Sequence, residues 1–207
     1  MTRDSGNESP SEPSARERVV GQLVSAAMTL FAERGPNRVS LREVAAAAGV
    51  NYGLIHQYVG TKEDLLGLVF RRASEDWAEQ FASAPTLEQA LAWQFRPQSA
   101  TYVRMLTHSL LDGHDPAKLL GRSPASQEMS RRLSEESAPV PGVADDPRIQ
   151  AAALTCMRLG WGLFGDFIRT VAGLDDRPED EVTEAVYATV RRAVLPRDPS
   201  SAANPAS

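Results

Sequence analysis

Hydrophobic residues recur every three or four positions in most segments of the chain. That period places them on one face of an α-helix, and we find no convincing run with the two-residue alternation of a half-buried strand. The first stripe runs from Val20 to Phe31. Ser14 and Glu17 have the spacing of a capping box before it, and Gly35 followed by proline ends it. The pattern predicts an all-α protein whose first helix ends before Gly35.

The next three predicted helices also have start and stop signals. Ser40 opens a second capping box, and Gly49 ends the short helix that follows it. Asn51 can cap another short helix, which ends near Tyr58, and Thr61 opens a long fourth helix. These caps lie close together, so we expect a compact unit of short helices at the N-terminal end.

Proline-rich breaks separate the later segments. The expected helices are residues 87–95, 102–111, a weaker one at 118–136, a long one at 147–171 and a last one at 178–194. Residues 1–13 and 196–207 have almost nothing to bury, and we expect both to be disordered tails. Residues 137–147 contain three prolines and predict a further break.

The composition is ordinary for a globular protein and excludes several classes. The 207 residues are 42% hydrophobic and 24% charged, with a net charge of −5. Any contact with DNA must therefore come from a local basic patch. The single cysteine, Cys156, cannot form an internal disulfide, and we expect it to be buried and unreactive. The chain has no signal sequence or long apolar run, so we expect a cytoplasmic protein without membrane contact.

Residues 40–62, SLREVAAAAGVNYGLIHQYVGTK, carry the most informative spacing. Ala45 lies four residues before Gly49, and Ile55 lies six residues after it. A small residue lets two short helices approach, the glycine accepts a positive φ in a tight turn, and Val50 and Ile55 lock the pair. This pattern indicates a helix-turn-helix, whose second helix can lie in the major groove of DNA.

The distribution of charge agrees with that interpretation. Residues 16–62 carry six basic and three acidic side chains, a net charge of +3. Residues 63–207 carry 15 basic and 21 acidic side chains, a net charge of −6. Because DNA phosphates attract cations, we expect the N-terminal part of the chain to dock on DNA.

Residues 16–66, and especially AAAAGVNYGLIHQYVGTKEDLL, resemble TetR-type transcriptional regulators. The resemblance implies an all-α fold with an N-terminal tri-helical helix-turn-helix DNA-binding domain, here residues 14–60. It also implies a C-terminal helical domain for effector binding and dimerisation, here residues 61–195. Beyond residue 70 the resemblance is one of architecture only. The family implies no enzymatic activity, cofactor or metal.

The resemblance assigns DNA-binding roles to ten residues. They are Ser40, Arg42, Asn51, Tyr52, Gly53, Leu54, His56, Gln57, Tyr58 and Lys62. Ser40 and Arg42 would approach phosphates or a base edge. The face of the recognition helix toward DNA would carry Asn51, Tyr52, Gly53, His56 and Gln57. Tyr58 and Lys62 would hold phosphates.

The chain departs from the family pattern within this set. Tyr52, Leu54 and His56 stand where a basic residue, a serine or threonine, and a tyrosine are frequent. Base reading would therefore use apolar contact with thymine methyl groups together with Asn51 and Gln57.

Several of these positions also have an ordinary structural explanation. Ser40 caps a helix whether or not it touches DNA. Lys62 could be a solvated lysine, although a lysine near a helix N-terminus is mildly unfavourable unless another group compensates. Tyr58 and Leu54 could simply pack in the core.

The last two predicted helices carry the expected dimer surface. Glycine inside a helix costs about 1 kcal/mol relative to alanine, so the glycines at 160, 162 and 165 predict close approach of another helix. The expected contact residues are Gly160, Trp161, Phe164, Val182, Val186 and Val190. They would form a four-helix bundle between two subunits, and such a dimer would read a palindrome. Packing of the two helices within one chain is the alternative.

The resemblance further implies an effector pocket among the middle helices. The candidate lining residues are Trp77, Trp93, Phe95, Tyr102, Met105, His108 and Phe167. Aromatic residues and methionine at helical spacing could equally form an ordinary core. If these residues line a pocket, the effector is largely apolar.

Together these patterns predict a homodimeric repressor that binds double-stranded DNA and is released by an unknown small-molecule effector. One alternative is an activator, or a regulator that a protein partner controls without a small ligand. Another is a helical enzyme or interaction module with a vestigial helix-turn-helix. The sequence signals for an enzyme are weak. His108 and His114 do not have the i, i+4 spacing of a helical zinc site, and residues 112–115 suggest a polar loop.

Overall fold

The computed structural model describes residues 14–94, 99–136 and 146–194. The predicted tails, Phe95 and most of the predicted break at 137–147 lie outside these ranges. The helices are α1 (Ala15–Arg34), the 3-10 helix η1 (Pro36–Arg38), α2 (Leu41–Ala48), α3 (Tyr52–Tyr58), α4 (Lys62–Ser83), α5 (Leu87–Gln94), α6 (Ser99–Leu111), α7 (Pro116–Leu120), α8 (Pro124–Glu136), α9 (Pro147–Val171) and α10 (Glu179–Val194). These ranges contain no strand, which agrees with the predicted all-α fold.

The N-terminal helices begin at the caps that the sequence predicts. The hydroxyls of Ser14, Ser40 and Thr61 each accept a hydrogen bond from the backbone N–H three residues later. The acidic side chain at that later position accepts one from the cap's own N–H in return. Each box thus satisfies two N–H groups that have no partner within the helix.

The helix bounds differ from the expected ones in the middle of the chain. Residues 118–136 fall into two helices, α7 and α8, because Gly121 adopts a φ of 53° and Pro124 starts a new helix. Helix α6 begins at Ser99 rather than at residue 102. Residues 99–101 and 121–128 contain no large apolar side chain, so the hydrophobic pattern did not mark these boundaries.

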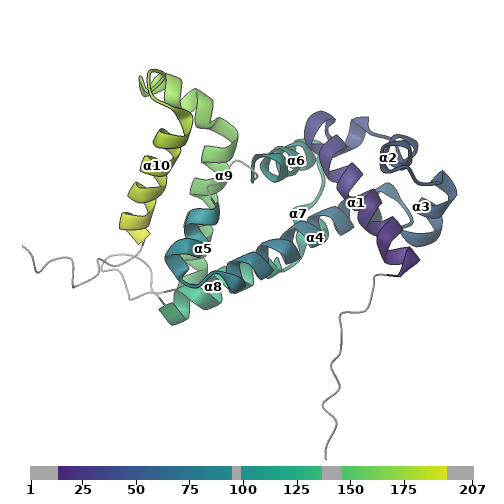
Figure 1. The fold of residues 1–207 in the computed structure, drawn as a ribbon, viewed down its shortest axis with the longest axis horizontal. Helices are drawn as coiled ribbons and strands as arrows, with labels where there is room; N and C mark the ends of the chain where they lie inside the picture. Colours follow the sequence, from purple (N-terminus) through teal and green to yellow (C-terminus); the bar gives the residue numbers. More distant parts are fainter. Residues whose placement is uncertain (1–13, 95–98, 137–145, 195–207) are drawn as a thin grey trace, which may run out of the picture.

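Two clusters of buried side chains hold the helices together. The first lies among α1, α2, α3 and the start of α4, and it includes Met105 of α6. The second joins Phe81 at the end of α4 to α5, α8, α9 and α10. Figure 1 shows α4 running from the α1–α3 unit to α5 and α8. The first core therefore crosses the predicted domain boundary at residue 60, and α4 links the two cores.

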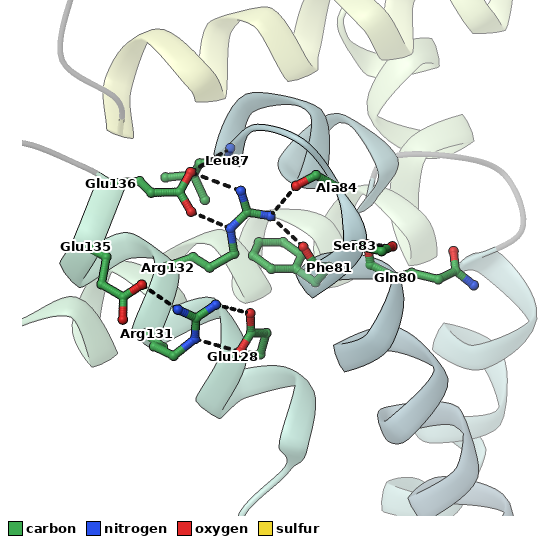
Figure 2. A network of polar contacts seen from close by, with 10 residues as sticks. All are labelled: Gln80, Phe81, Ser83, Ala84, Leu87, Glu128, Arg131, Arg132, Glu135 and Glu136. Carbon is green, nitrogen blue, oxygen red and sulfur yellow. Dashed lines mark hydrogen bonds and ion pairs between the residues drawn. The ribbon is translucent and has the colours of Figure 1, made fainter. Parts of the chain in front are cut away.

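A buried arginine fixes the turn between α4 and α5 against α8. Arg132 is 4% exposed, and its Nη1 donates to the backbone oxygens of Phe81 and Ala84 at 2.5 and 3.0 Å. Its Nε and Nη2 donate to Glu136, which also accepts the N–H of Leu87, as Figure 2 shows. These partners compensate for the removal of the charge from water.

Cys156 lies on the solvent side of α9. The buried positions of this helix include Ala151, Leu154 and Arg158, which share one face at helical spacing. Residue 156 lies two positions from both Leu154 and Arg158, so its side chain points away from them, and Cys156 is exposed. The expectation that it is buried is wrong.

Candidate nucleic-acid interface and internal cavity

The turn between α2 and α3 has the conformation that Gly49 permits. Gly49 adopts φ 65° and ψ 29°, and the N–H of Val50 donates to the oxygen of Ala45 at 2.9 Å. A left-handed residue of this kind closes the C-terminus of a helix. Ala45 and Ile55 are both buried beneath the turn. The turn therefore anchors α3 through Ile55, as the helix-turn-helix spacing predicts.

Burial of Ile55 directs the opposite face of α3 outward. The exposed residues are Asn51, Tyr52, Gly53, His56 and Gln57. Leu54 is half-buried, and the side-chain oxygen of Asn51 caps the helix by accepting the N–H of Gly53 at 2.9 Å. Amide, phenol and imidazole groups can all form hydrogen bonds with base edges. The exposed face of α3 therefore has the chemistry of a recognition helix.

Arg42, Tyr52 and His56 form a cluster that the sequence reasoning missed. The hydroxyl of Tyr52 lies 3.0 Å from Nε2 of His56, and the two rings meet edge to face with centroids 5.1 Å apart. The guanidinium of Arg42 lies 5.3 Å from the centroid of the Tyr52 ring. The i, i+4 spacing of the two aromatic residues was the available signal. The cluster joins α2 to α3 and holds a cation beside the exposed face of α3.

Ser40 acts as the cap of α2. Its hydroxyl accepts the N–H of Glu43 at 3.2 Å and donates to the Glu43 carboxylate at 2.8 Å. Arg34 of α1 pairs with the same carboxylate at 2.9 Å. Hydrogen bonds from the backbone and hydroxyl of Ser40, and then from Arg34, hold the pKa of Glu43 below its ordinary value. The capping role of Ser40 is confirmed, and its contact with DNA stays a prediction.

Tyr58 and Lys62 lie at the end of α3 and the start of α4, and both are half-buried. The guanidinium of Arg16 lies 5.9 Å from the Tyr58 ring centroid, so Tyr58 faces α1. The ammonium of Lys62 lies 3.5 Å from the backbone oxygen of Val39, directly before Ser40. This contact brings a cation to the N-terminus of α2, where a helix favours phosphate.

Comparison with known proteins agrees with this geometry. Residues 23–69 match the bacterial regulatory proteins of the tetR family. The HTH-type transcriptional repressor Rv3405c of Mycobacterium tuberculosis is 31% identical over 187 residues, which cover 89% of this chain and 93% of that protein. The chain belongs to the TetR family. It is a DNA-binding transcriptional regulator, and the relatives that it matches are regulators rather than enzymes.

Solved structures of TetR-family regulators share the fold. NalD, the secondary repressor of the MexAB-OprM multidrug efflux pump in Pseudomonas aeruginosa, is 24% identical, with a TM-score of 0.56 over 88% of this chain and 99% of that one. A tetR-family regulator from Streptomyces coelicolor is 22% identical, with a TM-score of 0.55 over 92% of this chain and 95% of that one. The chain thus has the predicted helix-turn-helix followed by a helical C-terminal domain. Across the described residues, every helix is too short or too polar to cross a membrane.

The helical part of this TetR-family chain contains a cavity of about 240 Å³ that is lined by residues of α4, α6, α7, α8 and α9. Trp77 and Tyr102, two of the predicted pocket residues, line it. Much of the remaining wall is apolar and includes Leu106 and Met129. Arg158 also lines the cavity, and the sequence reasoning missed it because a lone arginine in a helix has no pattern that marks it as buried.

The other predicted pocket residues in the described ranges lie elsewhere. Trp93 packs edge to face on the cavity tryptophan, with centroids 4.8 Å apart. Met105 is fully buried in the N-terminal core, and His108 faces Gly35 between α1 and η1. Phe167 is 65% exposed on α9. The structure corrects its assignment to the pocket, because its side of α9 faces away from α4 and α8.

The predicted dimer residues divide into a buried and an exposed group. Val182 and Val190 of α10 are buried, and Val186 packs against the second core. Trp161 is partly buried and donates its indole N–H to Thr183 at 3.2 Å. The exposed apolar residues of α9 near these positions are Leu163, Phe164, Phe167, Ile168 and Val171. Val182, Val186 and Val190 therefore pack within the chain, whereas Phe164 remains exposed.

The glycines of α9 divide in the same way. A Cβ at Gly162 would lie 3.1 Å from Cγ2 of Val103, so α6 makes the close approach at this position. A Cβ at Gly160 would meet no atom within 4 Å. The compensation for Gly162 therefore comes from the same chain, and Gly160 faces open space.

Helix α6 connects the cavity with the helix-turn-helix unit. Tyr102, near the start of α6, lines the cavity. Near the other end, the carboxylate of Asp112 accepts the N–H of Asn37 at 3.2 Å. His108 packs against Gly35, and a Cβ added at Gly35 would lie 3.3 Å from the Nδ1 atom of His108. Gly35 has φ 80° and ψ 148°, a backbone conformation that favours glycine. The segment predicted as a polar loop thus anchors the end of α6 to η1.

Proposed function

We propose that this chain is a homodimeric repressor, released from a palindromic operator in the cytoplasm by a largely apolar small molecule. The observation that carries the DNA part is the exposed face of α3, which buried Ile55 holds outward. Arg42 lies beside this face, and Lys62 lies at the start of α2. Asn51 and Gln57 would form hydrogen bonds with base edges.

The remaining residues of the interface have complementary roles in this proposal. Leu54 contacts thymine methyl groups, and Arg42 and Lys62 pair with phosphates. The Tyr52–His56 pair, held at 3.0 Å, presents two polar side chains in a fixed geometry next to Gly53. Ser40 offers its hydroxyl to a phosphate at the start of α2, and Tyr58 offers its own from the end of α3.

The dimer forms through the exposed apolar face of α9. Phe164 and Phe167 are 53% and 65% exposed, which is unusual for side chains of this size. TetR-family regulators typically bind DNA as dimers, and a two-fold dimer places two α3 helices at a fixed separation. Both α3 helices must dock at the same time. The operator should therefore have two half-sites that are one helical turn of DNA apart, or a multiple of that distance.

Effector binding is coupled to DNA binding through α4 and α6. Both helices line the cavity, and both pack against the helix-turn-helix core. A ligand that favours one arrangement of α4 and α6 would shift the separation of the two α3 helices. The loss of operator affinity would then depend on how much more tightly the ligand binds this arrangement than the arrangement that binds the operator.

Fluorescence anisotropy of the full chain tests the proposal. The probe is DNA that flanks the chain's own coding region, compared with random DNA of equal length across a salt series. We expect tight binding to the flanking DNA that survives excess random competitor. Absence of binding to either DNA at low salt would contradict the assigned interface. Specific binding that also requires a second protein would instead favour control by a protein partner.

A further inference from the structure

The cavity contains a buried cation with unused hydrogen-bond donors. Arg158 is 8% exposed, and its Nε and Nη1 have no hydrogen-bond acceptor within the described part of the chain. A guanidinium keeps its charge in proteins, and its removal from water is costly without a partner. Burial lowers the pKa of Arg158, and the nearby Tyr102 only partly opposes that effect. The free protein therefore carries an incompletely compensated positive charge in its interior.

Arg132 shows how the same fold treats a buried arginine with a structural role. It is the other buried arginine of the described residues, and its guanidinium has four acceptors: two backbone oxygens and the two oxygens of Glu136 (Figure 2). Arg158 has no such set. The contrast indicates that an acceptor for Arg158 is to be supplied from outside the chain.

The surroundings of Arg158 orient its donors and leave them free. Its guanidinium carbon lies 4.6 Å from the centroid of Trp77 and 5.8 Å from that of Tyr102, and all three residues line the cavity. Aromatic faces attract a cation but accept none of its in-plane hydrogen bonds. The hydroxyls of Ser74 and Thr155 already have partners, namely Ser123 and the backbone of residue 151.

The rest of the wall fits an apolar body with one negative end. The cavity-lining residues among the described part of the chain include no Asp or Glu. Leu106, Met129 and Leu159 supply apolar surface. The volume of about 240 Å³ is below the roughly 300–1,000 Å³ that is usual for drug-sized ligands, which favours a compact molecule.

We propose that the cavity binds a small amphipathic carboxylate whose anionic group pairs with Arg158 and whose apolar body lies against Trp77 and Met129. This inference rests on the proposed function, since the carboxylate would be the effector that releases DNA. One cation in an otherwise uncharged wall matches a monoanion. The effector would then be an acid of defined charge rather than a generally apolar molecule.

Isothermal titration calorimetry of the full chain, without DNA, tests the preference for charge. The probes are 3-phenylpropanoate and hexanoate, each compared with its primary amide, which has nearly the same shape and no charge. We expect each acid to bind at least about tenfold more tightly than its amide, because a hydrogen bond to a charged partner is stronger than a neutral one. The acids should also quench tryptophan fluorescence, because Trp77 lines the cavity.

Three variants locate the preference. Arg158→Met keeps most of the side-chain volume, and it should abolish the difference between acid and amide. Removal of an uncompensated buried charge should leave this variant at least as stable as the parent chain. Arg158→Lys should retain part of the preference, and Arg148→Met should retain all of it, because Arg148 is an exposed arginine on the same helix.

The outcomes separate this inference from the proposed function. Equal affinity for acid and amide, a preference that survives in Arg158→Met, or no binding of either acid at millimolar concentration would overturn the carboxylate assignment while operator binding stayed intact. A chain that prefers the acids but binds no DNA would overturn the proposed function instead. Release of the operator by the acids, and not by the amides, would support both.

Discussion

Lys62 and Lys118 are the two lysines of the chain, and they allow a matched test of the interface. Lys62 lies beside the start of α2, whereas Lys118 is exposed on α7. We expect Lys62→Ala to weaken binding to specific and random DNA alike and to lower the salt dependence by about one counterion per subunit. Lys118→Ala should change neither quantity. Anisotropy titrations across a salt series measure both, and equal effects of the two variants would rule out a phosphate contact at Lys62.

Asn51 combines a structural and a proposed reading role, and two substitutions separate them. Asn51→Ala removes the cap of α3 and should lower the free energy of unfolding by about 1 kcal/mol. Asn51→Ser retains a capping oxygen but loses the amide, so it should keep the stability and lose sequence preference. Denaturant unfolding and competition between operator and random DNA give the two values. Full specificity in the serine variant would remove Asn51 from the set of base-reading residues.

Tyr187 makes stability depend on pH at the alkaline end. Burial, and then the charge of Glu88, raise its pKa from 10 in the unfolded chain to about 12 in the folded chain. Because the folded pKa is the higher one, this contribution is fully present below pH 10 and is lost as pH rises through about 12. Between these pH values, the denaturant concentration at the midpoint of unfolding should fall less steeply with rising pH in Tyr187→Phe than in the parent chain. Tyr52→Phe, at an exposed position, serves as the control and should keep the steeper fall.

At the scale of elements, two glycines that end helices differ in what an added methyl group would meet. Gly49 has φ 65° and ψ 29°, and its Cβ would meet no atom within 4 Å. Gly49→Ala should therefore cost only the left-handed conformation, about 1–2 kcal/mol of unfolding free energy. Gly35 has φ 80° and ψ 148°, and its Cβ would lie 3.3 Å from His108.

Gly35→Ala should consequently cost more than Gly49→Ala, because contact with α6 adds to the backbone strain. Urea unfolding of both variants checks the order. Gly35→Ala should also weaken operator binding by displacing α6 from η1. A smaller loss of stability in Gly35→Ala than in Gly49→Ala would contradict the packing of His108 against this turn.

At the scale of the molecule, the exposed face of α9 determines assembly. Phe167→Glu places a charge in the proposed interface, and it should produce monomers with greatly reduced operator affinity, because two α3 helices no longer dock together. Leu111→Glu changes a side chain that is 80% exposed on α6, and it should leave the dimer intact. Sedimentation velocity measures the oligomeric state. A dimer that survives Phe167→Glu would place the interface elsewhere.

The sequence by itself determined the elements whose causes are local. Capping boxes at Ser14, Ser40 and Thr61 depend on residues three positions apart, and the turn at Gly49 depends on one glycine and its neighbours. The exposed face of α3 could also be predicted from the sequence, because burial of Ile55 fixes the direction of its neighbours on one short helix. For these features the periodic pattern and the local hydrogen bonds lead to the same structure.

Only the tertiary structure decided which helix faces meet. An apolar stripe does not say which partner covers it, so Val182 and Val190 of α10 are buried within the chain while Phe164 and Phe167 of α9 stay exposed. The surroundings of Arg158 likewise come from residues of five helices, between positions 73 and 159. No local sequence pattern shows that the Arg158 guanidinium is removed from water there. Burial is a property of long-range packing, and for this reason the cavity and its charge became visible only in the folded chain.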